Sequence, residues 1–159
     1  MAHWHTLQEA MDDLAERPPE ERFAVLVREY GTEAEMLPAG EVRTLFVYTW
    51  PDGRDSFDDH SRELVRMLHW IAPVRDVETY LQGTVTVYRA AADDRGVRWT
   101  LDEAGAKAAA KDGKTLFRGA IAATEVLGHF TGDGGNEALI DPDDLISVER
   151  IPPESHPTA

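Results

Sequence analysis

Three residues in the second half of the chain, Arg89, Thr100 and Glu137, carry side chains that could act together on a phosphate-bearing sugar. Arg89 follows the alternating run Val85–Tyr88, so we expect it on the apolar face of a strand with Val85 and Val87. A guanidinium can hold phosphate oxygens through two parallel hydrogen bonds. A carboxylate can stabilise the positive sugar that forms when a leaving group departs. If these groups face one cavity, they could hold the phosphate of such a sugar and cleave its glycosidic bond.

Each of these residues also has a plain structural interpretation. An arginine on an apolar face can form an ion pair with one of the chain's many carboxylates. Thr100 precedes an expected helix, where a hydroxyl is a natural cap. Trp99 is a large aromatic residue of the kind that usually fills a core. Glu137 follows a glycine-rich turn, where it could face solvent, cap the turn or project into a cleft.

The residues around these three occur in an order that resembles the arginine-serine-glutamate branch of the ADP-ribosyltransferases. The resemblance covers about Val77 to Ile151, and small actinobacterial and phage members similarly carry a helical segment before the arginine strand. The segments that carry it are Tyr88-Arg89, Trp99-Thr100-Leu101-Asp102 with the alanine-rich stretch behind it, Val126-Leu127-Gly128-His129-Phe130, Asn136-Glu137-Ala138-Leu139-Ile140-Asp141-Pro142 and the last strand Leu145–Ile151.

This resemblance implies a mono-ADP-ribosyltransferase that uses NAD as its substrate. Glu137, Arg89 and Thr100 would be catalytic, with Glu137 as the catalytic glutamate and Thr100 as a brace. Arg89, Ala90, Trp99, Thr100 and Glu137 would line the NAD site. The enzyme would break the nicotinamide–ribose bond and pass ADP-ribose to an unknown acceptor, for which a basic protein is one candidate. An NAD glycohydrolase, in which water is the acceptor, is the alternative on the same fold.

Three positions depart from the family's pattern. Arg98-Trp99-Thr100 stands where the family has serine-threonine-serine, and Ala90 stands where a glycine commonly follows the arginine. Gly135 occupies the position that is glutamate or glutamine in members that modify arginine or asparagine. The sequence therefore does not predict arginine as the acceptor.

Composition narrows the other possibilities. The 159-residue chain has a net charge of −14 and no cysteine. We therefore expect neither nucleic acid nor a membrane as partner, no metal site, and a cytoplasmic location. An acidic chain can also act without catalysis, so a second hypothesis is an interaction protein that mimics DNA and occupies the basic groove of a partner.

The order of elements predicts an α+β fold, with an N-terminal helical segment packed on a small ADP-ribosyltransferase-like β-sheet core. We expect helices in residues 1–76, a β-rich core in residues 77–151, and a tail in residues 152–159, within one compact domain. A helix that begins near Asp58-Asp59 carries Leu64, Leu68 and Ile71 on one stripe. This stripe favours an internal core over a docking surface. The helix after β-rich residues 97–99 should begin at Thr100 or Leu101, and the third helix should end at Tyr48, before Pro51-Asp52-Gly53.

Overall fold

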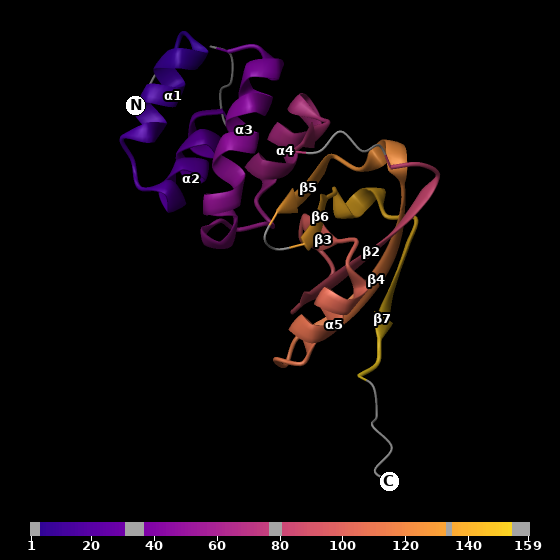
Figure 1. The fold of residues 1–159 in the computed structure, drawn as a ribbon. Coiled ribbons are helices and arrows are strands. Elements are labelled where there is room, and N and C mark those ends of the chain that lie inside the picture. Colours follow the sequence, from indigo (N-terminus) through magenta and orange to yellow (C-terminus); the bar gives the residue numbers. More distant parts are fainter. Residues whose placement is uncertain (1–3, 31–36, 77–80, 133–134, 154–159) are drawn as a thin grey trace. The chain divides into compact units, whose positions relative to one another are not determined.

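The computed structural model describes residues 4–30, 37–76, 81–132 and 135–153. It contains five α-helices and a mixed sheet of seven strands in the order β1-β5-β6-β3-β2-β4-β7 (Figure 1), which is an α+β arrangement as predicted. The chain divides into two compact units. The first holds residues 1–77 and 127–129, and the second holds residues 78–126 and 130–159. In the described ranges, no helix combines the length and the apolar character that crossing a bilayer requires.

Four helices build the first unit: α1 (Leu7–Ala15), α2 (Pro19–Tyr30), α3 (Ala39–Gly53) and α4 (Arg62–Ile71). Thr6 caps α1 by accepting a hydrogen bond from the Glu9 backbone N–H, and the Glu9 carboxylate accepts one from the His5 N–H. Thr6 and Glu9 have the sequence spacing of a capping box, which predicts a helix start here, and α1 begins there.

An aromatic cluster on α2 and α3 fills the centre of this unit. The ring of Phe23 meets Phe46 and Trp50 edge to face, with centroids 5.0 and 4.9 Å apart. The stripe on α4 is also buried, with Leu64, Leu68 and Ile71 fully inaccessible. This confirms that the stripe belongs to an internal core.

Two short elements complete the first unit. The 3-10 turn η1 (Arg54–Ser56) follows α3, and the strand β1 (Val74–Arg75) pairs in parallel with the start of β5 (Gly128–Gly132). A strand of two residues shows no alternation of apolar and polar side chains, so β1 was not predicted.

The second unit is built on antiparallel strands, with α5 (Glu103–Ala110) packed on β2 and β4. Its core holds Val87, Trp99, Ile121, Ala138 and Ile140. The strands are β2 (Thr84–Ala91), β3 (Arg98–Thr100), β4 (Thr115–Ala122), β6 (Gly135–Leu139) and β7 (Ser147–Ile151), with 3-10 turns η2 (Ala123–Glu125) and η3 (Pro142–Asp144) between them.

Three predicted helix boundaries are wrong, each for a local reason. α3 runs through Pro51 to Gly53, because a proline in the last turn interrupts few backbone bonds. α4 begins after Ser61, whose hydroxyl accepts from the Leu64 N–H, and not at Asp58-Asp59. α5 begins after its cap Asp102, since Thr100 is still part of β3. The sequence also predicts that the second helix stops at Gly31, and this residue lies outside the described ranges.

We predict that Gly53→Ala destabilises the first unit. A Cβ at Gly53 would lie 2.4 Å from the Cβ of Phe23, so α2 and the end of α3 would have to separate. The expected cost is about 1–3 kcal/mol of unfolding free energy, measured by chemical denaturation. Gly40→Ala is the matched control on the same helix, because its Cβ would meet only an Arg43 side-chain nitrogen at 3.9 Å. Equal stability of the two variants would contradict the packing described here.

Candidate functional site

Arg89 is buried and bonded to the backbone of its own unit. Its side chain is 7% exposed. Nε donates to the carbonyl of Asp93 at 2.9 Å, and a terminal nitrogen donates to the carbonyl of Arg98 at 2.9 Å. The Asp93 carboxylate lies 3.8 Å from the other terminal nitrogen. Arg89 thus ties together the two ends of the connection between β2 and β3.

Gly96 and Trp99 complete the surroundings of this guanidinium. A Cβ at Gly96 would lie 2.2 Å from a terminal nitrogen of Arg89, so the guanidinium packs directly on the Gly96 backbone. The indole of Trp99 is 2% exposed and donates to the Gly96 carbonyl at 2.9 Å. Trp99 is therefore a core residue, as its plain structural interpretation suggests.

Glu137 lies beside Thr100 and Arg98. It sits directly opposite Thr100 in the pairing of β3 with β6. Its carboxylate accepts a hydrogen bond from Nε of Arg98 at 3.1 Å and is 12% exposed. The Thr100 hydroxyl donates to the Asn136 carbonyl at 3.0 Å and accepts from the Asp102 N–H at 3.0 Å. Thr100 therefore joins β6, next to Glu137, to the start of α5.

The structure does not bring Arg89 and Glu137 to the same face of the sheet. Tyr88 pairs with Thr100, and Thr100 pairs with Glu137, so these three share one face. Arg89 is the next residue after Tyr88 and points to the other face, with Val87 and Trp99. Thr100 and Glu137 thus lie side by side on one face of the sheet, whereas Arg89 lies on the other face.

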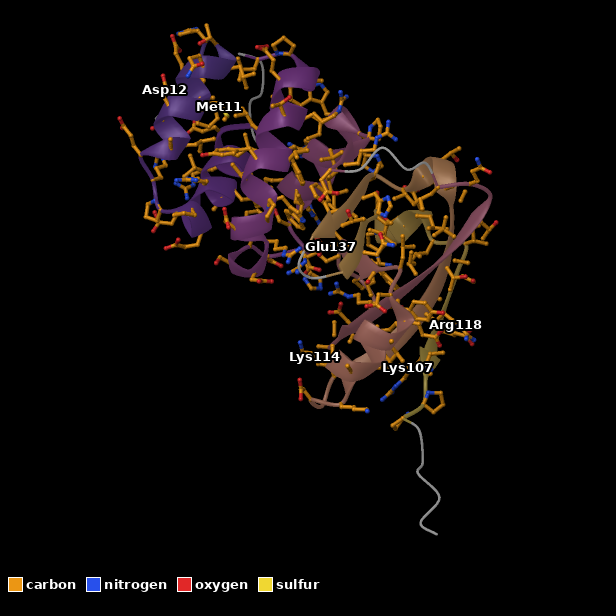
Figure 2. The ribbon with its side chains drawn as sticks, in the orientation of Figure 1. Met11, Asp12, Lys107, Lys114, Arg118 and Glu137 are labelled. Atoms are coloured by element: carbon orange, nitrogen blue, oxygen red, sulfur yellow. The ribbon has the colours of Figure 1, made fainter. Side chains whose placement is uncertain are left out.

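The face that carries Glu137 continues across the rest of the second unit. Tyr88 pairs with Arg118 on β4, and Arg118 pairs with Glu149 on β7. Nε of Arg118 donates to Glu149 at 2.7 Å. Ala90 lies on this face as well, opposite Leu116. Figure 2 shows Glu137 and Arg118 within this unit. Glu137 therefore shares one face of the sheet with a pocket that Tyr88 and Arg118 line.

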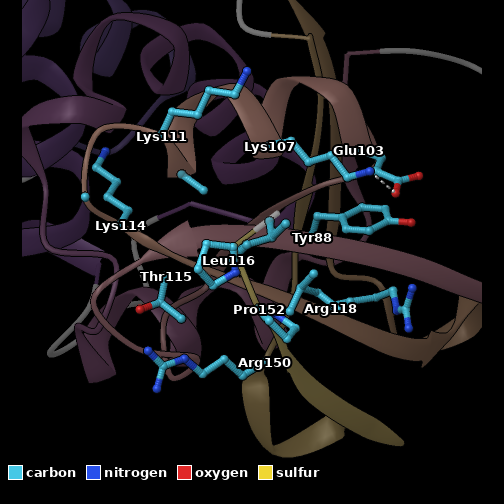
Figure 3. Close-up of a pocket in the computed structure, with 14 residues that line it drawn as sticks. Tyr88, Glu103, Lys107, Lys111, Lys114, Thr115, Leu116, Arg118, Arg150 and Pro152 are labelled. Carbon is cyan, nitrogen blue, oxygen red and sulfur yellow. Dashed lines mark ion pairs between the residues drawn. The ribbon is translucent and has the colours of Figure 1, made fainter. Parts of the chain in front are cut away.

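This pocket of about 790 Å³ lies between α5 and the strands β2, β4 and β7, and we call it the lysine pocket. Lys107 is paired with Glu103 at 3.1 Å. Figure 3 shows the side chains of Tyr88 and Leu116 among the surrounding cations. The lining consists of Tyr88, Glu103, Lys107, Ala110, Lys111, Gly113, Lys114, Thr115, Leu116, Arg118, Arg150, Ile151, Pro152 and Pro153.

Two pKa values at the pocket depart from their ordinary range. Partial burial, followed by the charge of Glu103 and a hydrogen bond to it, raises the pKa of Tyr88. The hydrogen bond and charge of Lys107 lower the pKa of Glu103. At neutral pH, Tyr88 thus keeps its proton and can donate, while Glu103 remains a carboxylate.

The sequence reasoning missed the lysine pocket and the contact of Arg98 with Glu137. One signal was visible: the only lysines in the chain are Lys107, Lys111 and Lys114, all within eight residues of an acidic protein. The spacing of the first two places them on one helical face. The contact of Arg98 with Glu137 had no such signal, because it arises from the pairing of β3 with β6.

A cluster of possible metal ligands occurs in the first unit. Ligand atoms of Asp58, Asp59 and His60 lie within 4.8 Å of one another. Nδ1 of His60 lies 3.2 Å from a carboxylate oxygen of Asp58 and 3.0 Å from one of Asp59, so the three side chains already contact one another. The backbone N–H of His60 is the main cause of a lowered pKa at Asp58.

We predict that Arg89 acts on stability. Arg89→Met leaves the carbonyls of Asp93 and Arg98 without this donor and should cost about 1–3 kcal/mol of unfolding free energy. Gly96→Ala should also destabilise, because its Cβ needs the space of the guanidinium. The double variant should lose less than the sum of the two, since both changes break one contact.

Denaturant unfolding measures these three free energies, and Gly132→Ala is the control, because its Cβ would meet nothing within 4 Å. Wild-type stability of Arg89→Met would contradict the role assigned here.

We predict that Glu103→Gln lowers the pKa of Tyr88 relative to the unchanged chain, because the charge that disfavours the phenolate is gone. Ultraviolet titration in alkaline solution measures the phenolate, and Tyr88→Phe identifies its share of the signal. Because the pKa of Tyr88 is raised in the folded state, Tyr88 stabilises the fold at pH values below about 10, the ordinary pKa of a tyrosine. That stabilisation should disappear as the pH rises through the folded-state pKa. A higher pKa of Tyr88 in Glu103→Gln would contradict this contact.

Comparison of the chain with protein-family models, with curated proteins and with solved structures found no match.

Proposed function

We propose that the second unit cleaves the nicotinamide–ribose bond of NAD and transfers ADP-ribose to an acceptor, with Glu137 as the catalytic carboxylate. The observation that carries this proposal is the direct pairing of Thr100 with Glu137, with Arg98 bonded to the carboxylate. The sequence resemblance implies a hydroxyl as the brace of a catalytic glutamate. The geometry of β3 and β6 supports that pair.

The proposed reaction needs a fixed negative charge close to the sugar. The bond between the ribose C1′ and the nicotinamide nitrogen breaks, and nicotinamide leaves with the bonding electrons. C1′ becomes positively charged, and Glu137 stabilises it by its charge and by accepting a hydrogen bond from a ribose hydroxyl. A nucleophile then bonds to C1′ and releases its proton. With water as that nucleophile, the same site is an NAD glycohydrolase.

The arginines take different roles in this proposal from those that the resemblance implies. Arg89 is 7% exposed, donates to two backbone carbonyls and lies on the opposite face of the sheet from Glu137, so it is not placed to hold a phosphate beside that carboxylate. We therefore assign Arg89 to the connection between β2 and β3. Arg98 is the cation that orients Glu137, through the 3.1 Å contact of its Nε with the carboxylate.

Charge and the turn before Glu137 guide the choice of acceptor. Gly135 supplies no side chain to recognise an arginine or asparagine acceptor. The net charge of −14 attracts cationic molecules. A basic protein is therefore the acceptor class that we propose to test first, with water as the competing nucleophile.

Glu137→Gln should lower the rate of nicotinamide release by about 100-fold, because the side chain keeps its shape and loses its charge. The assay incubates the pure protein with NAD labelled in its adenine half, with and without cell lysate, and follows free nicotinamide and labelled adducts. Unfolding curves show whether the variant is folded.

Glu125→Gln is the matched control, because this glutamate is exposed on η2 of the same unit. It should leave the rate unchanged. Equal rates for Glu137→Gln and the unchanged chain would remove Glu137 from the reaction. An unchanged chain with no turnover, which binds a basic protein in a strongly salt-dependent manner, would instead support the acidic interaction protein.

A further inference from the structure

We propose that the lysine pocket binds a small organic phosphate, with two or more phosphate groups attached to a flat or apolar body. A nucleoside diphosphate or triphosphate is a ligand of this class. Neither Thr100 nor Glu137 lines the pocket. The proposal therefore concerns a second site in the same unit and does not depend on the cleavage of NAD.

The charge of the lysine pocket is opposite in sign to the charge of the chain. The chain carries 30 acidic and 16 basic side chains, so an arbitrary part of its surface is expected to be acidic. The lysine pocket has the opposite composition: it contains all three lysines of the chain together with Arg118 and Arg150, and Glu103 is its one acidic residue. Such a concentration of cations in a concave site favours an anionic ligand.

Among the described residues, two of the five cations in the pocket are paired with carboxylates, and the other three are not. Lys107 is paired with Glu103, and Arg118 is paired with Glu149. In the part of the chain that the structure describes, the side chains of Lys111, Lys114 and Arg150 have no hydrogen bond or ion pair. Like charges around one pocket repel each other, and a ligand with several negative charges removes that repulsion. Lysine ammonium groups on flexible stems suit phosphate oxygens.

The pocket also has an apolar surface among its cations. Tyr88, Leu116, Ile151 and Pro152 line the pocket together with the charged groups. Figure 3 shows Leu116 and Pro152 between Lys111 and Lys114 and the guanidinium of Arg150. An inorganic anion would leave these apolar groups without a contact. A flat ring would pack against them, and the Tyr88 phenol provides an aromatic face.

Size and overall charge separate a small ligand from a polyanion. The volume of about 790 Å³ lies within the range of roughly 300–1,000 Å³ that is usual for small-molecule sites. The three cations without a partner among the described residues, together with Lys107 and Arg118 beside them, suffice for a diphosphate or triphosphate. A nucleic acid would meet the repulsion of a chain with a net charge of −14 outside the pocket. The structure therefore favours a small organic phosphate.

Calorimetric titration of the full chain with ATP, ADP, AMP, adenosine and inorganic triphosphate tests this proposal. We expect affinity to decrease from ATP through ADP to AMP, with no binding of adenosine and weaker binding of inorganic triphosphate than of ATP. Affinity for ATP should decrease as the salt concentration rises.

Two variants assign the binding to this pocket. Lys111→Gln/Lys114→Gln should weaken ATP binding at least about 10-fold. The control Arg62→Gln/Arg95→Gln removes two charges from exposed positions outside the pocket and should leave the affinity unchanged. Tyr88→Ala should weaken the binding of ATP and leave the binding of inorganic triphosphate unchanged. Unfolding curves confirm that each variant is folded.

Three results would overturn the proposal. The first is no binding of any phosphate compound by the unchanged chain at low salt. The second is a loss of ATP affinity in Arg62→Gln/Arg95→Gln equal to that in Lys111→Gln/Lys114→Gln. Such a result would show that the affinity depends only on the net charge of the chain. The third is binding of a polyglutamate peptide as tight as that of ATP, which would replace the organic phosphate with an acidic peptide.

Discussion

The placement of β3 between β2 and β6 determines which side chains of the second unit can act together. Its pairing sets Tyr88, Thr100 and Glu137 in one row and directs Trp99 into the core. Side chains alternate along a strand, so this one register decides the face of every neighbour. The same rule gives the orientation of Arg89: it is the next residue after Tyr88, so it points to the core face with Val87.

This division gives the two faces different kinds of chemistry. On the core face, Arg89 satisfies backbone carbonyls and closes a connection between strands. The other face carries the Glu137 carboxylate at one end and the lysine pocket toward the opposite edge strand. The protein as a whole is acidic, yet this pocket is basic. The net charge of the chain therefore does not predict the ligand of this pocket.

Local patterns in the sequence predict much of the fold. The cap at Thr6, the apolar stripe on α4 and the alternation that places Arg89 with Val87 each depend on neighbouring residues, and the structure agrees with them. The end of α3 was missed because Pro51 is tolerated in a last turn. The strand β1 was missed because two residues are too few to show the alternation of side chains that marks a strand.

The candidate site was only partly predictable, because its residues meet through strand pairing. No local pattern states that Glu137 pairs with Thr100 or that Arg98 reaches the carboxylate. The lysines after β3 are visible as a cluster, but the pocket requires Arg118 and Arg150 from distant strands. Alternation assigns a face to each residue of one strand, whereas the register between strands comes from the whole sheet.

Disulfide trapping tests the central claim, that Glu137 faces Thr100 and not Arg89. The chain contains no cysteine, so introduced pairs report without background. Because Leu101 and Asn136 form the adjacent hydrogen-bonded pair, Thr100 and Glu137 form a non-hydrogen-bonded pair, with Cα atoms roughly 4.5 Å apart. Under mild oxidation, Thr100→Cys/Glu137→Cys should lose both free thiols within one chain, and Arg89→Cys/Glu137→Cys should keep them. Closure of the second pair without the first would contradict the account.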